Sequence, residues 1–142
     1  MAAEEIKALV HRFFEEHNKG KAAAMTIIDK LCATNLVYHG GGGEEIRDIK
    51  NYKQSTSEGY NACPDLHYTI EDMVAEGDKV VIRVTVSGTH RGEFMGVAPT
   101  NKRVSWTSII ISRIVNGIIV ERWANTDMMQ QLGAVAIKTA SK

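Results

Sequence analysis

The stretch VSWTSIIISRIVNGIIVERWANTDMMQQLG, Val104 to Gly133, decides how this chain folds. Asn116-Gly117 lies between two runs rich in β-branched residues, and this dipeptide favours a type I′ turn because both turn positions need a positive φ. The stretch therefore predicts a β-hairpin followed by a short helix, Met128 to Ala134. Asp127 stands where the second strand ends and the helix begins, so it is either a helix cap or a group that takes part in chemistry.

The length and the charge of the chain narrow the classes of protein to consider. A chain of 142 residues fits one domain, 1–142, that can bury a core and enclose a pocket. Lys+Arg and Asp+Glu both total 17, and without a basic run a nucleic-acid partner is not expected. Glu4 and Glu5 stand where a signal peptide would be basic, and no apolar run is long enough to span a membrane, so the protein is expected in the cytoplasm. Cys32 and Cys63 are isolated from each other and from histidines, so no metal site is predicted.

Helical patterns dominate the first 63 residues. An amphipathic helix runs to a stop at Gly20, a second helix covers Lys21 to Ala33, and a third covers Glu44 to Cys63, ending before a proline. Between the last two, Asn35 to His39 is a short β-like run, and four glycines, Gly40 to Gly43, form a loop without the spacing of a phosphate-binding motif.

The hydrophobic period then changes to that of strands. Four strand candidates follow, namely Leu66 to Ala75, Lys79 to Thr89, Lys102 to Ile114 and Ile118 to Asn125. Most of their connections are short, which favours antiparallel neighbours. The sequence therefore predicts an α+β fold in which helices pack on one face of a curved antiparallel sheet and leave a funnel between the layers.

Several short motifs are shared with a known family. They are Pro64-Asp65-Leu66, Gly88-Thr89-His90, Gly92-Glu93-Phe94, Pro99-Thr100 and Gln131-Leu132-Gly133. Over about residues 5 to 134 the chain resembles the SnoaL-like polyketide cyclases, also called ester cyclases, of the nuclear-transport-factor-2-like superfamily. The resemblance implies a cone-shaped domain with a ligand pocket, and relatives on this fold commonly pair through the exposed face of the sheet. Because the fold hosts many reactions and also silent binding domains, it does not by itself establish one.

The resemblance also implies roles for three residues. Asp127 matches the aspartate that serves such cyclases as acid/base in an intramolecular aldol closure, which needs no cofactor. Asn35 and His39 fall near positions that carry polar cavity residues, and His39 is also near the place of the base in ketosteroid isomerases. These two residues would orient a small hydrophobic carbonyl substrate.

The chemistry of Asp127 depends on its surroundings. In a funnel lined by Trp123 and Met128, desolvation would raise the pKa of the carboxyl towards a useful range for proton transfer. The alternative is that Asp127 caps the following helix, and a cap can also line a pocket. Both interpretations remain open at this point.

Other candidate ligand contacts have equally simple structural roles. Trp106 and Trp123 come from adjacent strands and form either an aromatic wall or part of the core. Phe94 covers a flat substrate or anchors its long loop, and His90 touches a ligand or anchors the same loop. The charged Arg83 in an apolar strand is expected to pair with Glu121 across strands.

Three classes of function fit these features: a cofactor-free cyclase or isomerase, a non-catalytic small-molecule-binding domain, and an interaction domain that uses the outer sheet face. The strands are apolar on both parities, with Ile109 to Ile111 consecutive, and both faces of such a sheet cannot be solvated comfortably. A homodimer through the sheet face is therefore expected.

Overall fold

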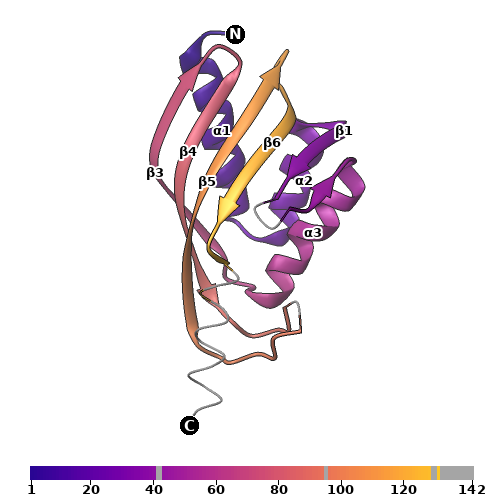
Figure 1. Ribbon diagram of the computed structural model, residues 1–142, viewed down its shortest axis with the longest axis vertical. Coiled ribbons are helices and arrows are strands. Elements are labelled where there is room, and N and C mark those ends of the chain that lie inside the picture. The colour runs from indigo at the N-terminus through magenta and orange to yellow at the C-terminus, as the bar shows by residue number, and fades with distance from the viewer. Residues whose placement is uncertain (41–42, 95, 129–130, 132–142) are drawn as a thin grey trace.

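Helices and a single curled sheet form two layers in the structure (Figure 1), a computed structural model that describes residues 1–40, 43–94, 96–128 and 131. The helices are α1 (Ala3–His17), α2 (Lys21–Leu31) and α3 (Ile49–Ala62). The strands are β1 (Cys32–His39), β2 (Glu45–Ile46), β3 (His67–Glu76), β4 (Lys79–Thr89), β5 (Arg103–Val115) and β6 (Ile118–Thr126). The predicted α+β class is confirmed.

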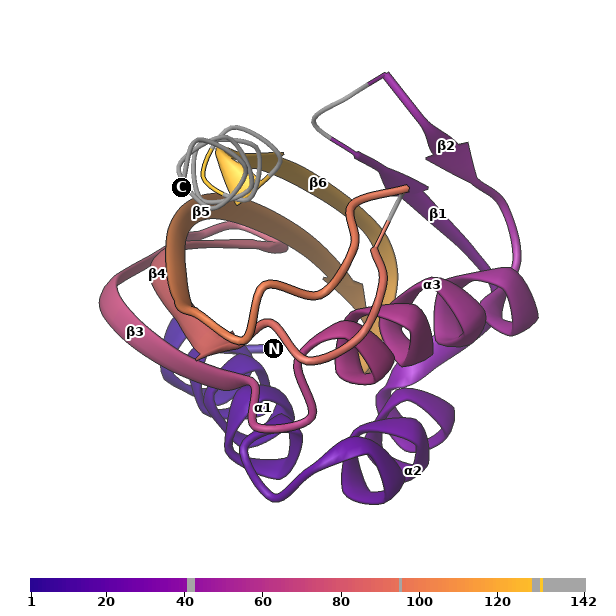
Figure 2. The same cartoon turned by 90° about the horizontal axis from the view of Figure 1, so that it is seen from below.

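The six described strands make one sheet in the order β2-β1-β6-β5-β4-β3. Neighbours from β3 to β6 are antiparallel, as the short connections predict, and β1 joins parallel to β6. Figure 2 shows the sheet curling around one side of the molecule, with the helices on the other side and the connection from β4 to β5 passing below the layers. The sheet is thus mixed and open.

The hairpin predicted at Asn116-Gly117 is present, and the two residues have φ of 52° and 77°. Two other boundaries differ from the prediction. The second helix stops at Leu31 because β1 begins at the next residue. The third helix begins at Ile49, since the side chain of Asp48 caps it by accepting a hydrogen bond of 2.7 Å from the Asn51 N–H.

The core lies between the helices and the inner, helix-facing side of the sheet. Its largest fully buried side chains are Phe13, Ile6, Ile28, Leu36, Ile82 and Ile119. Burying each such side chain contributes about 1.5–3 kcal/mol, which is what holds the two layers together. In the described part of the chain, none of the helices has the length and apolar character needed to cross a membrane.

The connection from β4 to β5 is tied to the end of α3. The backbone N–H groups of Arg91 and Gly92 donate to the Ala62 carbonyl at 2.8 and 3.0 Å. A Cβ at position 92 would lie 2.2 Å from the Asn61 carbonyl oxygen, so only glycine allows this approach. The motif Gly92-Glu93-Phe94 therefore begins where the β4–β5 connection is joined to the end of α3.

Candidate functional site

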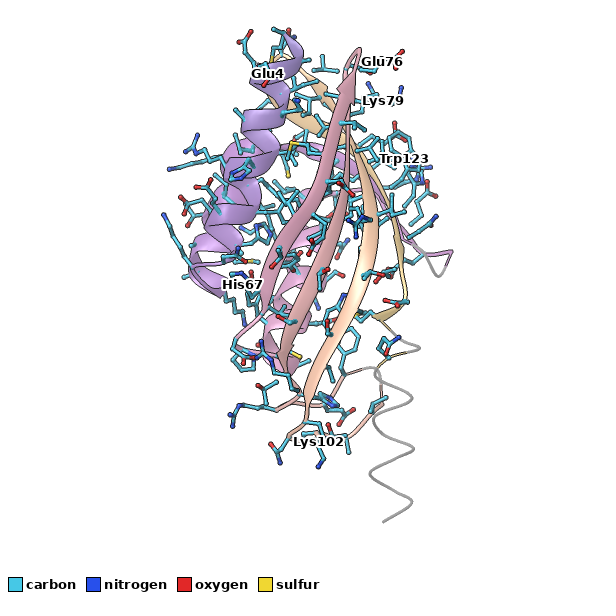
Figure 3. The ribbon with its side chains drawn as sticks, turned by 90° about the vertical axis from the view of Figure 1, so that its left-hand side faces the viewer. Glu4, His67, Glu76, Lys79, Lys102 and Trp123 are labelled. Carbon is cyan, nitrogen blue, oxygen red and sulfur yellow. The ribbon has the colours of Figure 1, made fainter. Side chains whose placement is uncertain are left out.

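A β-bulge in β6 decides which of its side chains reach the interior. Between two paired positions β5 advances by one residue while β6 advances by two, which leaves Val120 unmatched. Because side chains alternate along a strand, one extra residue moves every later side chain to the opposite face. Ile119 and Arg122 consequently both face the helices, whereas Trp123 lies on the side of the sheet away from α1 (Figure 3).

Arg122 is the charged group of the interior, and it is 3% exposed. Its Nη1 donates a hydrogen bond to the hydroxyl of Tyr52 on α3. The guanidinium carbon lies 4.9 Å from the ring centre of Phe13 and 5.4 Å from that of Phe14, both on α1. These are cation–π distances, and the Nε of Arg122 has no hydrogen-bond partner among the described residues.

The neighbours of Arg122 on the inner face are polar but uncharged. Tyr38 of β1 and Ser112 of β5 are its register partners on either side. Ser112 is buried, and half-buried Tyr38 has its ring centre 5.3 Å from that of Tyr52. Within the described ranges Arg122 takes part in no ion pair, so its charge is not neutralised by a carboxylate.

The interior affects the protonation of several groups. Burial works to lower the pKa of Arg122, but the Tyr52 phenol and other acidic groups outweigh it, so that pKa lies above its ordinary value. Burial lowers the pKa of His17 to about 4, and the charge of Arg122 acts in the same direction. Burial also raises the pKa of Tyr68 to about 12. At neutral pH the interior therefore holds a cationic guanidinium, a neutral imidazole and neutral phenols.

Asp127 lies beyond the end of β6, opposite Thr107 of β5. Its backbone N–H donates to the Thr107 carbonyl at 3.2 Å, and its Oδ1 accepts a hydrogen bond of 2.7 Å from the Thr107 N–H. The carboxylate thus takes the place of a backbone acceptor in the strand ladder. Its Oδ2 lies 3.4 Å from Nε2 of Gln131, and the side chain is half-buried.

The predicted helix Met128 to Ala134 is described only at Met128 and Gln131. The Gln131 N–H donates to the Asp127 carbonyl at 3.0 Å, which is the first-turn geometry of a helix that starts after Asp127. The predicted side-chain cap would involve backbone groups outside the described residues.

Four of the predicted ligand contacts are buried or partly buried towards the lower end of the sheet. Trp106 is 8% exposed, while Phe94 and Met128 are partly buried against the core. His90 is fully buried, and its N–H donates to the Lys102 carbonyl at 2.9 Å, so it does anchor the loop. Its Nε2, however, has no partner within the described part of the chain, which leaves a ring nitrogen free for a ligand.

His39 lies on the outer face of the sheet. Its ring stacks on Trp123 at 5.4 Å between centres, and with the proton on Nε2 it donates to Glu121 Oε2 at 2.8 Å. This hydrogen bond, followed by that from Arg113 at 3.2 Å, holds the pKa of Glu121 below its ordinary value. His39 and Asp127 are therefore held by different partners, and Asn35 is exposed on β1.

Two interpretations of single residues change with this placement. Arg83 pairs with Asp72 at 2.7 Å and not with Glu121, because the cross-strand neighbour of Arg83 on β3 is Asp72. Trp106 and Trp123 lie on opposite faces of the sheet and form no common wall.

A hollow of about 330 Å³ opens on the outer face of the sheet. Its lining residues are Lys79, Ile109, Ile111, Trp123, Ala124 and Asn125.

The interior arginine is the residue that sequence reasoning missed. Alternation counted from Ile119 places Trp123 inside and Arg122 outside, and nothing in the sequence marks the bulge that reverses this order. The resulting chemistry consists of a carboxylate at the end of β6 and a guanidinium deeper on the same strand. Among the described residues no group of three His, Cys, Asp or Glu side chains is arranged to hold a metal ion.

Comparisons with known proteins agree with this architecture. A family profile described as SnoaL-like polyketide cyclase matches residues 8–135. AclR from Streptomyces galilaeus, described as a candidate hydroxylase, is 32% identical, with a TM-score of 0.80 over 94% of this chain and 86% of that one. IdmH from Streptomyces antibioticus, described as a candidate polyketide cyclase, is 30% identical, with a TM-score of 0.75 over 89% and 97%.

A SnoaL-like structure from Jannaschia sp. CCS1 has a TM-score of 0.86 at 19% identity, over 94% of this chain and 93% of that one, and shows the shared fold alone. The comparison with curated proteins gives no match.

Proposed function

We propose, because the chain belongs to the SnoaL-like polyketide cyclase family, that it acts on a small hydrophobic carbonyl compound as a cofactor-independent cyclase or isomerase. The reaction would be an intramolecular aldol closure with Asp127 as acid/base. The carboxylate removes a proton alpha to one carbonyl, and the resulting enolate carbon attacks a second carbonyl carbon. The new alkoxide then takes the proton back from the carboxyl group, which restores the carboxylate.

The position of Asp127 carries this proposal. The hydrogen bond from Thr107 holds Oδ1 in place, and among the described residues the contact of Oδ2 is the long one of 3.4 Å with Gln131. We therefore propose Oδ2 as the oxygen that transfers the proton. Met128, the next residue, packs against the core, and Trp106, which precedes Thr107, is buried in that core. The Asp127 side chain is half-buried and next to these apolar neighbours, a setting that supports the proposed acid/base chemistry.

The surroundings of the other predicted site residues decide which of them we propose as ligand contacts. Trp106, Phe94, Met128 and His90 are proposed as the apolar and hydrogen-bonding lining, because all four are at least partly buried. His39 is engaged by Glu121 on the outer face, so we do not assign it the base in this proposal.

A non-catalytic binding domain is the second candidate. It is favoured by the observation that Asp127 completes the β5–β6 ladder, a structural duty that needs no chemistry. In that case the interior holds an apolar metabolite without changing it.

The experiment that separates these candidates uses Asp127→Asn, which keeps an oxygen able to accept from Thr107 but removes the acid. Linear aromatic polyketide esters and β-diketones are incubated with the protein, and products are followed by mass spectrometry. Enzymatic function predicts a loss of turnover of about 100-fold or more. Asp72→Asn, which removes a carboxylate from the exposed pair with Arg83, is the control. Unchanged turnover in Asp127→Asn would reject the acid/base role.

We further propose a homodimer formed through the outer sheet face. Ile109 is 52% exposed there, beside the hollow bordered by Ile111 and Trp123. An apolar patch of this kind is usually covered by a partner.

A further inference from the structure

Among the described residues the charge of Arg122 has no carboxylate partner, a feature that neither the fold nor the acid/base role proposed for Asp127 explains. The guanidinium is nine-tenths buried or more, it has no carboxylate partner in the described ranges, and its Nε is without a hydrogen bond. A buried charge is costly unless it is paired, and proteins seldom retain one without compensation. The Tyr52 hydroxyl and the rings of Phe13 and Phe14 compensate the charge in part, and the rest of the compensation is expected to come from a ligand.

The geometry of the guanidinium indicates what that ligand offers. One corner, Nη1, is engaged by Tyr52, and the rings of Phe13 and Phe14 lie at cation–π distance. The side of the planar fork that carries Nε and Nη2 presents two parallel N–H groups, which match the two oxygens of a carboxylate. The surrounding rings suit an aromatic or otherwise hydrophobic body.

We propose that Arg122 is an anion-binding site in the interior, and that it receives the carboxylate of a small hydrophobic acid through Nε and Nη2. Two register partners of Arg122 supply polar surface next to the bound group, half-buried Tyr38 on β1 and buried Ser112 on β5.

This inference deepens the proposed function and rests on it only in taking the interior as the ligand site. Arg122 and Asp127 are five residues apart on one chain segment, which corresponds to roughly 16 Å in an extended strand. A ligand held at Arg122 by its carboxylate would therefore need an elongated body to bring a carbonyl group to Asp127. The substrate class becomes an extended hydrophobic keto acid.

The test measures binding of two probes of the same shape, 2-naphthoate and uncharged 2-naphthamide, by isothermal titration calorimetry with the full chain. The natural protein is expected to bind the naphthoate at least about tenfold more tightly, because a charge-assisted paired hydrogen bond exceeds a neutral one. Arg122→Gln is expected to abolish this preference. Arg113→Gln is the control: it removes a positive charge from the outer face of neighbouring β5, and this variant should retain the preference for the naphthoate.

A second readout does not depend on the variant folding. In the natural protein, 2-naphthoate should shift the Arg122 Nε–H signal in a nitrogen-15 NMR spectrum, and 2-naphthamide should leave it unchanged. Equal affinity for the two probes, absence of binding to either, an unmoved Nε–H signal, or an intact preference in Arg122→Gln would overturn the anion site. Both readouts measure binding without turnover, so failure of the acid/base role proposed for Asp127 and failure of the anion site are seen separately.

Discussion

The carboxylate of Asp127 and the backbone N–H of Thr107 form a hydrogen bond of 2.7 Å that continues the β5–β6 ladder past the end of β6. The Asp127 side chain thus accepts the hydrogen bond that a backbone carbonyl would accept in a regular ladder. The backbone carbonyl of Asp127 accepts instead from the N–H of Gln131. The structural duty of this hydrogen bond and the acid/base role that we propose therefore fall on the same residue.

Asp127→Ala and Asp127→Asn are expected to separate those duties. Alanine removes the acceptor for Thr107 and should lower the free energy of unfolding by about 1 kcal/mol, since water can reach the partly exposed site. Asparagine retains an acceptor and should cost less than about half of that. Urea unfolding followed by circular dichroism measures both values. Equal losses in the two variants would mean that this hydrogen bond contributes nothing.

His17 makes the stability of the fold depend on pH. Burial lowers its pKa to about 4 in the folded protein, despite the hydrogen bond to the Phe13 carbonyl, from 6.5 when unfolded. Between these pH values the unfolded chain holds one more proton, so stability is complete above pH 6.5 and falls as the pH decreases to about 4. The loss amounts to about 3 kcal/mol.

Unfolding free energies measured between pH 7 and pH 4 test this dependence. His17→Met should have a much flatter profile in that window, whatever its absolute stability. His11→Gln removes an exposed histidine from the same helix and should retain the slope of the natural protein. A profile of His17→Met that matches the natural one would contradict the assignment.

Two glycines near the end of α3 should respond oppositely to alanine. At Gly92 the new Cβ would meet the Asn61 carbonyl at 2.2 Å, so the loop after β4 must move and stability should fall by about 1–3 kcal/mol. At Gly59, inside α3, the nearest atom is 3.6 Å away, and alanine should add about 0.5–1 kcal/mol because it favours the helix. Thermal unfolding compares the two, and a stable Gly92→Ala would show that the approach to α3 is dispensable.

The proposed dimer depends on the exposed apolar side chains of the outer face. Ile109→Lys places a charge in the middle of that face and should convert the dimer to a monomer in light scattering coupled to size-exclusion chromatography. Gln54→Lys adds the same charge on exposed α3 and should leave the dimer intact. A natural protein that elutes only as a monomer would refute the interface.

Local chemistry was enough to predict many of the elements. The Asn116-Gly117 turn needs positive φ at two adjacent positions, and the structure has 52° and 77° there. The predicted start of the third helix at Glu44 was wrong, because the side chain of Asp48 caps the helix and the apolar period begins before that cap.

The local sequence does not predict which face of the sheet each site residue occupies. The helix-facing position of Arg122 and the outward position of Trp123 both follow from the unmatched Val120, and His39 reaches Glu121 only because β1 lies parallel to β6. These are pairings between segments far apart in the chain, and they leave no local pattern.

The sequence by itself thus determined the hairpin, the helices and the fold class, because backbone preferences and hydrophobic periods act over a few residues, and the family resemblance singled out Asp127 as the candidate carboxylate. Only the tertiary structure decided which face each side chain occupies. The physical reason is that alternation has a period of two, so a single bulge selected by strand pairing exchanges the inner and outer faces of everything that follows it.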